Sequence, residues 1–464
     1  MLTYDLSRRG ELPLYAYLYR CIRADILEGR LPAGEKLPSK RTLAEHLHIS
    51  EQTAERVYGQ LVAEGYLIAK RCSGHYVAQV ELRPAGETPP QKSRNTTETR
   101  PFRLDLSSNF SGGDKFPFAT WGKLMRRVLS EQDRALLMDV PNTGVTALRE
   151  AIARHLHSFR GITVSPDQIV IGAGAEYLYQ ILIQLLGRGR VVGIENPGYR
   201  KIGAVYAGND VRCLPLALDL EGVILPTEKD SAVKTLHVSP SHHYPTGIVM
   251  SPNRRRALLQ WAYGGADRMI LEDDYDSEFR FAGRPIEPLM AMDTQERVIY
   301  LNTFSQTIAP AMRISYMVLP PHLMERYQRT LGFYACPVPS FEQHTLAAFL
   351  DGGYFEQHLN RMRNYYKAKR EMVLTAFRAS SFADRITLTE YGAGLHFLLH
   401  VDTKESCEML KKRAEEQSVR LAFLRDFYEQ GSGQVDEHTL VVNYAGLDST
   451  QMAENMALLA EILG

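Results

Sequence analysis

The chain has 464 residues, enough for two to four domains with sizeable hydrophobic cores. Hydrophobic residues make up 44% and charged residues 23%, both close to globular averages, which excludes global disorder and fibrous repeats. Lys plus Arg (54) equals Asp plus Glu (54), so any affinity for nucleic acid or membranes must come from a local patch.

The cysteines and the apolar runs indicate where the protein works. Five cysteines are scattered without a CxxC pair, and their odd number argues against a disulfide framework. The first twenty residues carry charges where a signal peptide needs an apolar run, and no stretch of eighteen apolar residues occurs. We therefore expect a protein of the reducing cytoplasm that does not enter membranes.

A polar segment divides the chain. Residues 80–104 are rich in Pro, Thr, Glu and basic side chains and poor in large apolar ones, as is typical of a linker between domains. A surface loop of this length inside a compact domain is rare. We expect a small N-terminal domain at 1–79, a linker at 80–104 and a body at 105–464, whose smaller C-terminal part begins near 340.

The N-terminal domain has the pattern of a helix-turn-helix. Apolar residues recur every fourth position in a first helix (Leu14, Leu18, Ile22 and Ile26). Ser39 is placed to cap a short second helix, and Ser50 to cap a third one that Gly65 ends. Two short helices separated by a tight turn are typical of DNA-binding domains. A hairpin follows, with strands at 66–69 and 75–77, and adds a wing.

Charge alone does not choose between DNA binding and a protein-interaction module, because residues 1–78 hold 11 basic and 9 acidic side chains. The segments LPSKRTLAEHLHIS, VYGQLVAEGYL and SGHYV, however, closely resemble the winged helix of GntR-type bacterial regulators. The resemblance implies binding to double-stranded DNA. It places Ser39, Lys40 and Arg41 at phosphates and the groove as the second helix begins. Ser50 opens the third helix, and Gln52, Thr53 and Arg56 on that helix face the major groove.

One position departs from that family. Glu51 stands where its members usually carry Arg after the serine that opens the recognition helix. A carboxylate repels phosphate and accepts a hydrogen bond only from a base amine such as that of cytosine. We therefore expect an unusual operator.

The body alternates apolar strand-like runs with helical patterns, which predicts an α/β fold with a mostly parallel sheet covered on both faces. The expected strands and helices are 168–171, a helix at 175–186, 191–194, 235–238, 269–271, 298–301 and 314–319, then helices at 342–350 and 354–377.

Three segments of the body supply the side chains that pyridoxal phosphate chemistry needs: a carboxylate for the pyridine nitrogen, and a phosphate site at a helix N-terminus with a cation. IGAGAEYLYQ places a Gly-rich turn before a helix, so the backbone N–H groups of Ala175 and Glu176 can hold a phosphate. LEDDYDSEF offers Asp273 and Tyr275 at the end of a strand, where α/β proteins usually bind ligands. VIYLNTFSQTIAPAMRISY adds hydroxyl and guanidinium ligands (Thr303, Ser305 and Arg313).

Together with FPFATW, TGVTALREAIARHL, ENPGY, SPSHHYPTG and YGAGLHF, these segments resemble the fold-type I aminotransferases from about Leu104 to the C-terminus. Joined to a winged helix, this is the architecture of the MocR/GabR subfamily of GntR regulators. The resemblance implies a homodimer that binds pyridoxal phosphate. In it Tyr199 stacks on the cofactor ring, Asp273 pairs with the ring nitrogen and Tyr275 reaches the phenolic oxygen.

The same resemblance exposes a loss. The family carries its Schiff-base lysine directly after the second serine of T-F-S, where this chain has Gln306. No lysine occurs from 235 through 366, and only Lys201, near ENPGY, is a remote substitute. Val441 also stands where the family often has an arginine for a substrate carboxylate. We therefore expect no catalytic residue, and pyridoxal phosphate held non-covalently at best.

No metal site is expected, because His242 and His243 have no carboxylate or cysteine at metal spacing, which favours structural hydrogen bonding. Three functions remain open. The first is a transcriptional regulator whose body senses a small-molecule effector, either pyridoxal phosphate or an amino-acid-like ligand. The second is a pyridoxal-phosphate-dependent aminotransferase, which the missing lysine disfavours. The third is a regulator whose body binds no ligand and only dimerises.

Overall fold

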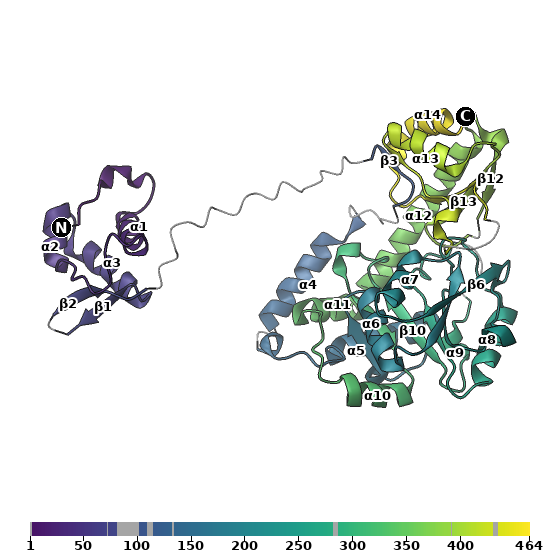
Figure 1. Ribbon diagram of the computed structural model, residues 1–464, viewed down its shortest axis with the longest axis horizontal. Helices are drawn as coiled ribbons and strands as arrows, with labels where there is room; N and C mark the ends of the chain where they lie inside the picture. Colours follow the sequence, from purple (N-terminus) through teal and green to yellow (C-terminus); the bar gives the residue numbers. More distant parts are fainter. Residues whose placement is uncertain are drawn as a thin grey trace. The chain divides into compact units, whose positions relative to one another are not determined.

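The computed structural model describes residues 2–71, 73–80, 102–108, 115–131, 134–281, 286–390, 392–429 and 435–464. The chain divides into two compact units, residues 1–99 and 100–464 (Figure 1). Most of the expected linker at 80–104 lies outside the described residues. Leu104 is already a buried strand residue of the second unit.

The first unit confirms the expected helix-turn-helix and hairpin. Its elements are α1 (Leu14–Leu27), α2 (Lys40–Leu47), α3 (Glu51–Ala63), β1 (Leu67–Lys70) and β2 (Gly74–Val77). Leu18 and Ile22 of α1 pack on Val57 and Leu61 of α3 in a separate small core. The strands pair antiparallel, with Leu67 opposite Val77, so the wing begins one residue later than the sequence suggests.

The second unit is built on one eight-stranded sheet, ordered β4-β11-β10-β9-β8-β5-β6-β7. Its strands are β4 (Ile169–Gly172), β5 (Val191–Asn196), β6 (Cys213–Asp219), β7 (Gly222–Val223), β8 (Val233–Val238), β9 (Met269–Asp273), β10 (Val298–Thr303) and β11 (Ser315–Val318). The central pairs are parallel, whereas β11 is antiparallel to both neighbours and β7 to β6. The mostly parallel sheet is thus confirmed.

Helices cover both faces because successive strand residues point to opposite sides. Ile169 and Ile171 of β4 pack toward α5 (Thr146–Arg160) and α11 (Ser340–Asp351). Val170 between them packs toward α6 (Ala175–Leu186), whose bounds match those expected, and toward α10 (Pro321–Leu331). The remaining helices of this part are α4 (Phe118–Glu131), α7 (Arg200–Ala207), α8 (Pro252–Tyr263) and α9 (Leu289–Met292).

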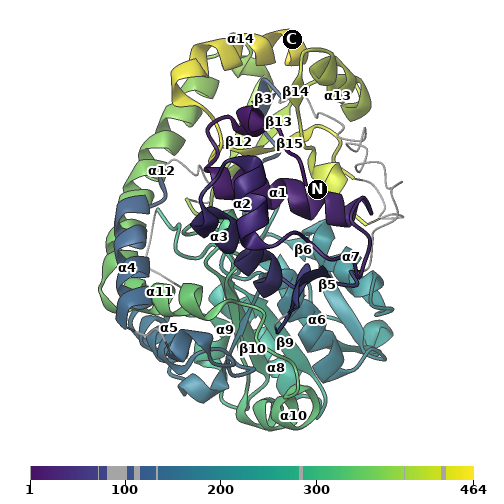
Figure 2. The ribbon, with the colours of Figure 1, turned by 90° about the vertical axis from the view of Figure 1, so that its left-hand side faces the viewer.

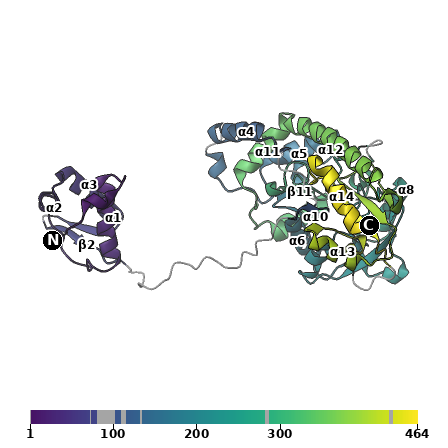
Figure 3. The ribbon, with the colours of Figure 1, turned by 90° about the horizontal axis from the view of Figure 1, so that it is seen from above.

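The smaller C-terminal part has its own core around a three-stranded sheet, β12-β13-β15. Its elements are α12 (Tyr354–Arg378), β12 (Ile386–Thr389), β13 (His396–Val401), α13 (Cys407–Glu416), β14 (Val419–Arg420), β15 (Thr439–Asn443) and α14 (Met452–Leu463), and β14 pairs with β3 (Leu104–Asp105). The long helix α12 runs from the large part into the small one (Figure 2), and α14 packs against it (Figure 3).

Both cores share α12. Phe355 and Leu359 near its start pack with the large part, while Tyr366 and Phe377 pack with the small one. A single rigid helix therefore fixes the small part above the carboxyl edge of the sheet, where β5, β8, β9 and β10 all end. Within the described residues, no helix is both long and apolar enough to cross a bilayer.

Candidate functional site

The helix-turn-helix of the first unit is fixed by two serine caps. The Ser39 Oγ accepts a hydrogen bond from the Thr42 amide at 3.0 Å, and the Ser50 Oγ accepts one from the Thr53 amide at 3.1 Å. His48 takes a left-handed conformation (φ 52°) in the turn between α2 and α3. The two serine hydroxyls therefore cap α2 and α3 and fix where each helix begins.

The cationic side chains expected at DNA all have partners within their unit. Lys40 Nζ lies 2.6 Å from Glu55 Oε1, and Arg41 Nε lies 3.0 Å from Glu45 Oε1. The Arg56 guanidinium lies over the Tyr15 ring of α1, 3.9 Å from its centroid. Exposed ion pairs of this kind are worth little, so phosphates can replace the carboxylates. Gln52 and Thr53 begin the exposed face of α3, and Gln52 is exposed.

The wing and the segment before α2 contribute cations that the sequence analysis did not assign to DNA. Lys70 Nζ lies 4.6 Å and Lys36 Nζ 5.9 Å from the centroid of the Tyr76 ring, and the Tyr76 hydroxyl contacts Ser73 Oγ at 2.7 Å. Exposed Arg71 adds a third basic side chain. The pair Lys70-Arg71 at the hairpin turn could have predicted this contribution from the sequence, because a basic turn between strands suits a phosphate contact.

In the second unit, Asp273 ends β9 inside a buried hydrogen-bond network. The Tyr179 hydroxyl donates to Asp273 Oδ2, and His237 Nε2 lies 3.4 Å from the same oxygen. The Tyr206 hydroxyl in turn contacts His237 Nδ1 at 3.0 Å. Burial, followed by the charge of Asp273, raises the pKa of Tyr179 well above its ordinary value, so its hydroxyl remains a donor. The network holds the carboxylate in one orientation.

The start of α6 brings two cations to one carboxylate. Gly174 has φ 94°, and a Cβ there would lie 2.4 Å from Arg313 Nη2, so only glycine lets this guanidinium approach the helix end. Arg313 Nη2 lies 2.7 Å from Glu176 Oε2, and Lys201 Nζ lies 2.9 Å from Glu176 Oε1. Burial alone would raise the pKa of Glu176, but hydrogen bonds from Lys201 and Arg313 lower it to about 2. We call Gly174, Glu176, Lys201 and Arg313 the cradle.

Thr303 and Ser305, in the turn after β10, differ in availability. The Thr303 Oγ1 accepts from the Ser305 amide at 3.2 Å and from the Ser315 hydroxyl at 2.8 Å, so it stabilises the turn. The Ser305 Oγ is buried and has no hydrogen-bond partner among the described residues. A buried hydroxyl without a partner is costly unless a ligand or water satisfies it.

The comparisons with known proteins agree with this geometry. Residues 103–457 match the family described as "Aminotransferase class I and II", and residues 14–77 match "Bacterial regulatory proteins, gntR family". The chain belongs to this aminotransferase family and carries a GntR-family domain at its N-terminus.

Full-length relatives share both parts. The chain is 33% identical to the uncharacterized HTH-type transcriptional regulator YdeL of Bacillus subtilis over 98% of each chain. It is 32% identical to the probable rhizopine catabolism regulatory protein MocR of Rhizobium meliloti, over 97% of this chain and 94% of that one. The body resembles the crystal structure of Pyrococcus horikoshii kynurenine aminotransferase, with a TM-score of 0.69, 25% identity and coverage of 79% and 91%.

The side chains expected around the ring of the cofactor are placed as follows in this member of the aminotransferase family. Tyr199 directly precedes α7, is 45% exposed and meets the Tyr244 ring edge-on, with 5.9 Å between the ring centroids. Tyr275 directs its hydroxyl to His242 Nδ1 at 3.2 Å, so reaching a ligand requires exchange of that contact. Gln306 follows Ser305 in the turn after β10 and is partly exposed. Fully buried Val441 offers no charge to a substrate.

The residues present fit pyridoxal phosphate, the cofactor expected of this family. The unpartnered Ser305 Oγ, the Arg313 and Lys201 cations and the first-turn amides of α6 suit a phosphate, because those amides have no acceptor inside the helix. Glu176 already holds both cations, so a phosphate must exchange places with its carboxylate. Asp273 suits a ring nitrogen.

Buried carboxylates and histidines surround this edge of the sheet, and the sequence analysis did not identify their contacts. Glu195 accepts a hydrogen bond from the Ser239 amide at 2.9 Å, and burial raises its pKa to about 8. His242 Nδ1 lies 2.8 Å from Asp276 Oδ2, and His243 Nδ1 lies 2.7 Å from Thr246 Oγ1. Both histidines are hydrogen-bonded as expected, His242 to a carboxylate 34 positions away in the sequence and His243 to a hydroxyl three positions away.

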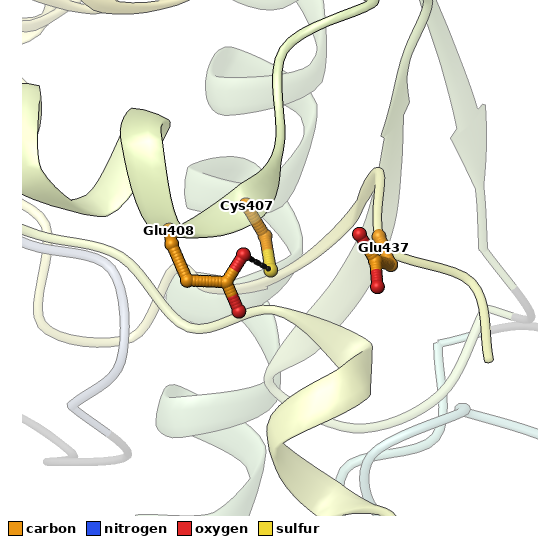
Figure 4. A group of neighbouring side chains, drawn as sticks. All are labelled: Cys407, Glu408 and Glu437. Carbon is orange, nitrogen blue, oxygen red and sulfur yellow. Dashed lines mark hydrogen bonds between the residues drawn. The ribbon is translucent and has the colours of Figure 1, made fainter.

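One group of three side chains among the described residues has ligand atoms close enough to share a metal: Cys407, Glu408 and Glu437 (Figure 4). The Cys407 thiol donates to Glu408 Oε2 at 3.2 Å. Arg425 Nη1 lies 3.1 Å from Glu408 Oε1 and 2.5 Å from Glu437 Oε1. The guanidinium therefore already offsets part of the negative charge of this group.

Proposed function

We propose that the chain is a DNA-binding transcriptional regulator whose aminotransferase-like body binds a small effector, pyridoxal phosphate or an amino-acid-like ligand, without Schiff-base catalysis. The observation that carries this proposal is the joining of a capped helix-turn-helix to a body whose turn after β10 carries Gln306 in T-F-S-Q. A carboxamide does not form an imine, and this position is where the family places both its Schiff-base amine and its general base.

The DNA-reading residues divide into two roles. Arg41 and Lys40, at the start of α2, are proposed to contact phosphates, with Ser39, Ser50 and Thr53 setting the helix ends. Gln52 is proposed to read a base edge from the exposed face of α3. Arg56, stacked on Tyr15, is proposed to support this face and contact the backbone of the DNA.

Binding of the purified full chain to its own upstream intergenic DNA tests this assignment. Arg41→Ala should weaken binding to all sequences and lower the salt slope by about one, whereas Gln52→Ala should mainly change sequence preference. Fluorescence anisotropy over a salt series, with a scrambled duplex as control, measures both quantities. Equal losses on all sequences for both variants would contradict the assigned roles.

The body is proposed to form a homodimer that presents two DNA-reading units to paired half-sites. Sedimentation at micromolar concentration checks this, and a monomer would refute it. In the bound state, Asp273 would orient the ring nitrogen of pyridoxal phosphate, and Arg313, Ser305 and the amides of Ala175 and Glu176 would hold its phosphate. The cofactor would supply an electron-withdrawing ring and aldehyde.

The ligand-free alternative has one specific observation in its favour: the cradle cations are already paired with Glu176. Absorption spectra separate the alternatives. A pyridoxal phosphate band that is removed by dialysis supports reversible binding, whereas no spectral change with excess cofactor supports a body that only dimerises. Steady production of a keto acid from any amino acid donor would instead establish an aminotransferase.

A further inference from the structure

A cavity of the second unit is lined by Ser241 and His242 but not by Tyr199 or the cradle residues. It has a volume of about 300 Å³, enough for a small metabolite. Its walls come from the end of α5, the loops after β8 and β9, helix α12, and Ala393 in the segment that precedes β13. Three guanidinium groups (Arg160, Arg280 and Arg363) line it, so we call it the arginine cavity.

Arg160 forms the floor of the arginine cavity. Its side chain is only 9% exposed, and its Nη2 lies 2.8 Å from Asp274 Oδ2 and 3.1 Å from Ser241 Oγ. Its Nε is buried and has no acceptor among the described residues. Asp274 is also committed to the Tyr300 hydroxyl at 2.5 Å. One donor of a nearly buried guanidinium therefore remains unsatisfied.

Arg280 and Arg363 have no carboxylate partner within the described part of the chain. The Arg280 Nε is buried without an acceptor, and Arg363 uses its Nε for the Glu278 backbone oxygen at 2.6 Å. The backbone around Arg280 is fixed to the small part, because Phe281 N donates to Gly392 O and Gly394 N donates to Phe279 O. Holding like charges close together without counter-ions is unfavourable.

The acidic groups that face this cavity do not balance the three cations. Asp276 is paired with His242 Nδ1 at 2.8 Å, and Asp274 with Arg160. Burial, followed by the charge of Asp274, raises the pKa of Glu278 to about 7. The His242 Nε2 is buried and lacks a partner among the described residues, but with Nδ1 donating to Asp276 it is an acceptor in the neutral ring. The unfilled donor positions at this cavity are therefore those of Arg160 and Arg280, and its guanidinium groups outnumber its carboxylates.

We propose that the arginine cavity binds a small organic anion, with one or two carboxylate or phosphate groups on a short apolar body. Planar guanidinium groups match both anions through paired hydrogen bonds. Phe159, Phe279 and Ile286 supply an apolar wall for the remainder of the ligand. The site is separate from the cradle and goes beyond the proposed function, since it depends neither on DNA binding nor on the cofactor.

Such a ligand joins the two parts of the body. Arg160 belongs to α5 of the large part, whereas Arg363 lies on α12 between Leu359, which packs with the large core, and Tyr366, which packs with the small core. An anion held by both guanidinium groups therefore resists movement of the small part relative to the sheet. Its binding should stabilise the whole second unit.

Calorimetric titration of the full chain with glutarate and, separately, with inorganic phosphate tests the proposal. We expect saturable binding below about 10 mM for at least one probe, with a dissociation constant about tenfold or more weaker in Arg280→Gln and in Arg363→Gln. Binding of glutarate alone identifies a carboxylate site, and binding of phosphate alone a phosphate site. Arg280→Lys, which keeps the charge, should show a smaller loss.

Two controls keep the outcome clear. Arg361→Gln removes an exposed cation on the same helix as Arg363 and should leave binding of both probes unchanged, and Arg313→Gln removes the cradle cation and should leave glutarate binding unchanged. Because the cradle is also proposed to hold phosphate, phosphate binding supports the arginine cavity only where Arg280→Gln weakens it and Arg313→Gln does not. The proposal is overturned if neither probe binds, if Arg280→Gln and Arg363→Gln both bind as the unaltered chain does, or if Arg313→Gln abolishes glutarate binding. Circular dichroism of each folded variant accompanies the titrations.

Discussion

In the cradle, Arg313 and Lys201 both form ion pairs with Glu176. In the arginine cavity, by contrast, Arg280 and Arg363 form no ion pair with a carboxylate of the described residues. The cradle thus carries its own anion, and a ligand must exchange with it. The arginine cavity has no such internal counter-ion for these two cations. The number of cations is therefore a poor guide to an anion site, because what matters is whether the fold already neutralises them.

The largest expected effect is a gain of covalent pyridoxal phosphate binding in a variant at residue 306. Gln306→Lys places an amine directly after Ser305, beside the cradle, and should convert reversible pyridoxal phosphate binding into a yellow adduct that borohydride fixes to residue 306. Absorption spectroscopy and peptide mass spectrometry measure this gain. Gln306→Met, similar in length but without an amine, should remain colourless after dialysis. A colourless Gln306→Lys variant in excess cofactor would show that the pocket has changed beyond its lysine.

A second change should damage the arginine cavity and leave the cradle unaltered. Gly394 has φ 69°, and a Cβ there would lie 1.7 Å from His242 Cε1. Gly394→Ala should destabilise the chain by about 1 to 3 kcal/mol and displace His242, weakening glutarate binding without changing the affinity for pyridoxal phosphate. Denaturant unfolding and titration measure these effects.

Gly353→Ala is the matched control for this change. Gly353 also has φ 69°, but a Cβ there meets no atom within 4 Å. Gly353→Ala should therefore lose only the stability that backbone strain costs, about 1 kcal/mol. If both variants lose equal stability and both keep glutarate binding, the contact between Gly394 and His242 has no part in the cavity.

A third change tests whether Glu176 competes with a phosphate for the cations of the cradle. Glu176→Gln removes the internal anion, so Arg313 and Lys201 become available, and inorganic phosphate or pyridoxal phosphate should bind about tenfold more tightly at low salt. Lys201→Gln should have the opposite effect, because it removes a cation and leaves Glu176 in place. Titrations at two ionic strengths compare the variants. Unchanged affinity in both would mean that the phosphate is held elsewhere.

The sequence predicted local structure well wherever a local signal existed. Ser39 and Ser50 marked both helix starts because a capping hydroxyl is a short-range requirement, and α6 was predicted to the residue by the turn at Gly174 and the apolar pattern after it. Strand β6, next to the short edge strand β7, was not predicted, since CLPLALD contains a proline and lacks a clean alternation.

The two sites were less accessible to sequence reasoning for a physical reason. Glu176 in a first helical turn is an ordinary complement to the helix dipole, so nothing local indicates that it also neutralises Lys201 and Arg313. Arg160, Arg280 and Arg363 lie on three separate elements, and only the crossing of α12 over the carboxyl edge of the sheet brings them to one cavity. Contacts of this kind depend on the chain topology, and local sequence patterns do not show which distant segments the topology brings together.

The smallest expected effect is on the pH dependence of stability, which should differ between a buried glutamate near the cradle and one near the arginine cavity. Burial raises the pKa of Glu195, on the cradle side, to about 8, and that of Glu278, on the side of the arginine cavity, to about 7, from an ordinary 4.5. Because both folded-state values are raised, each carboxyl contributes stability that is fully present below pH 4.5 and is lost as pH rises through its folded pKa.

Replacing either glutamate with glutamine removes this loss, because a carboxamide does not ionise. The advantage of Glu195→Gln over the unaltered chain should therefore grow from about pH 4.5 and level off near pH 8, whereas that of Glu278→Gln should level off near pH 7. Thermal unfolding in a buffer series should show gains of about 2 to 4 °C at the plateaus. Glu150→Gln, at an exposed position of α5, should give a flat difference. A flat difference for Glu195→Gln as well would mean that its carboxyl is ionised at neutral pH, and the cradle would then carry one more negative charge against an incoming phosphate.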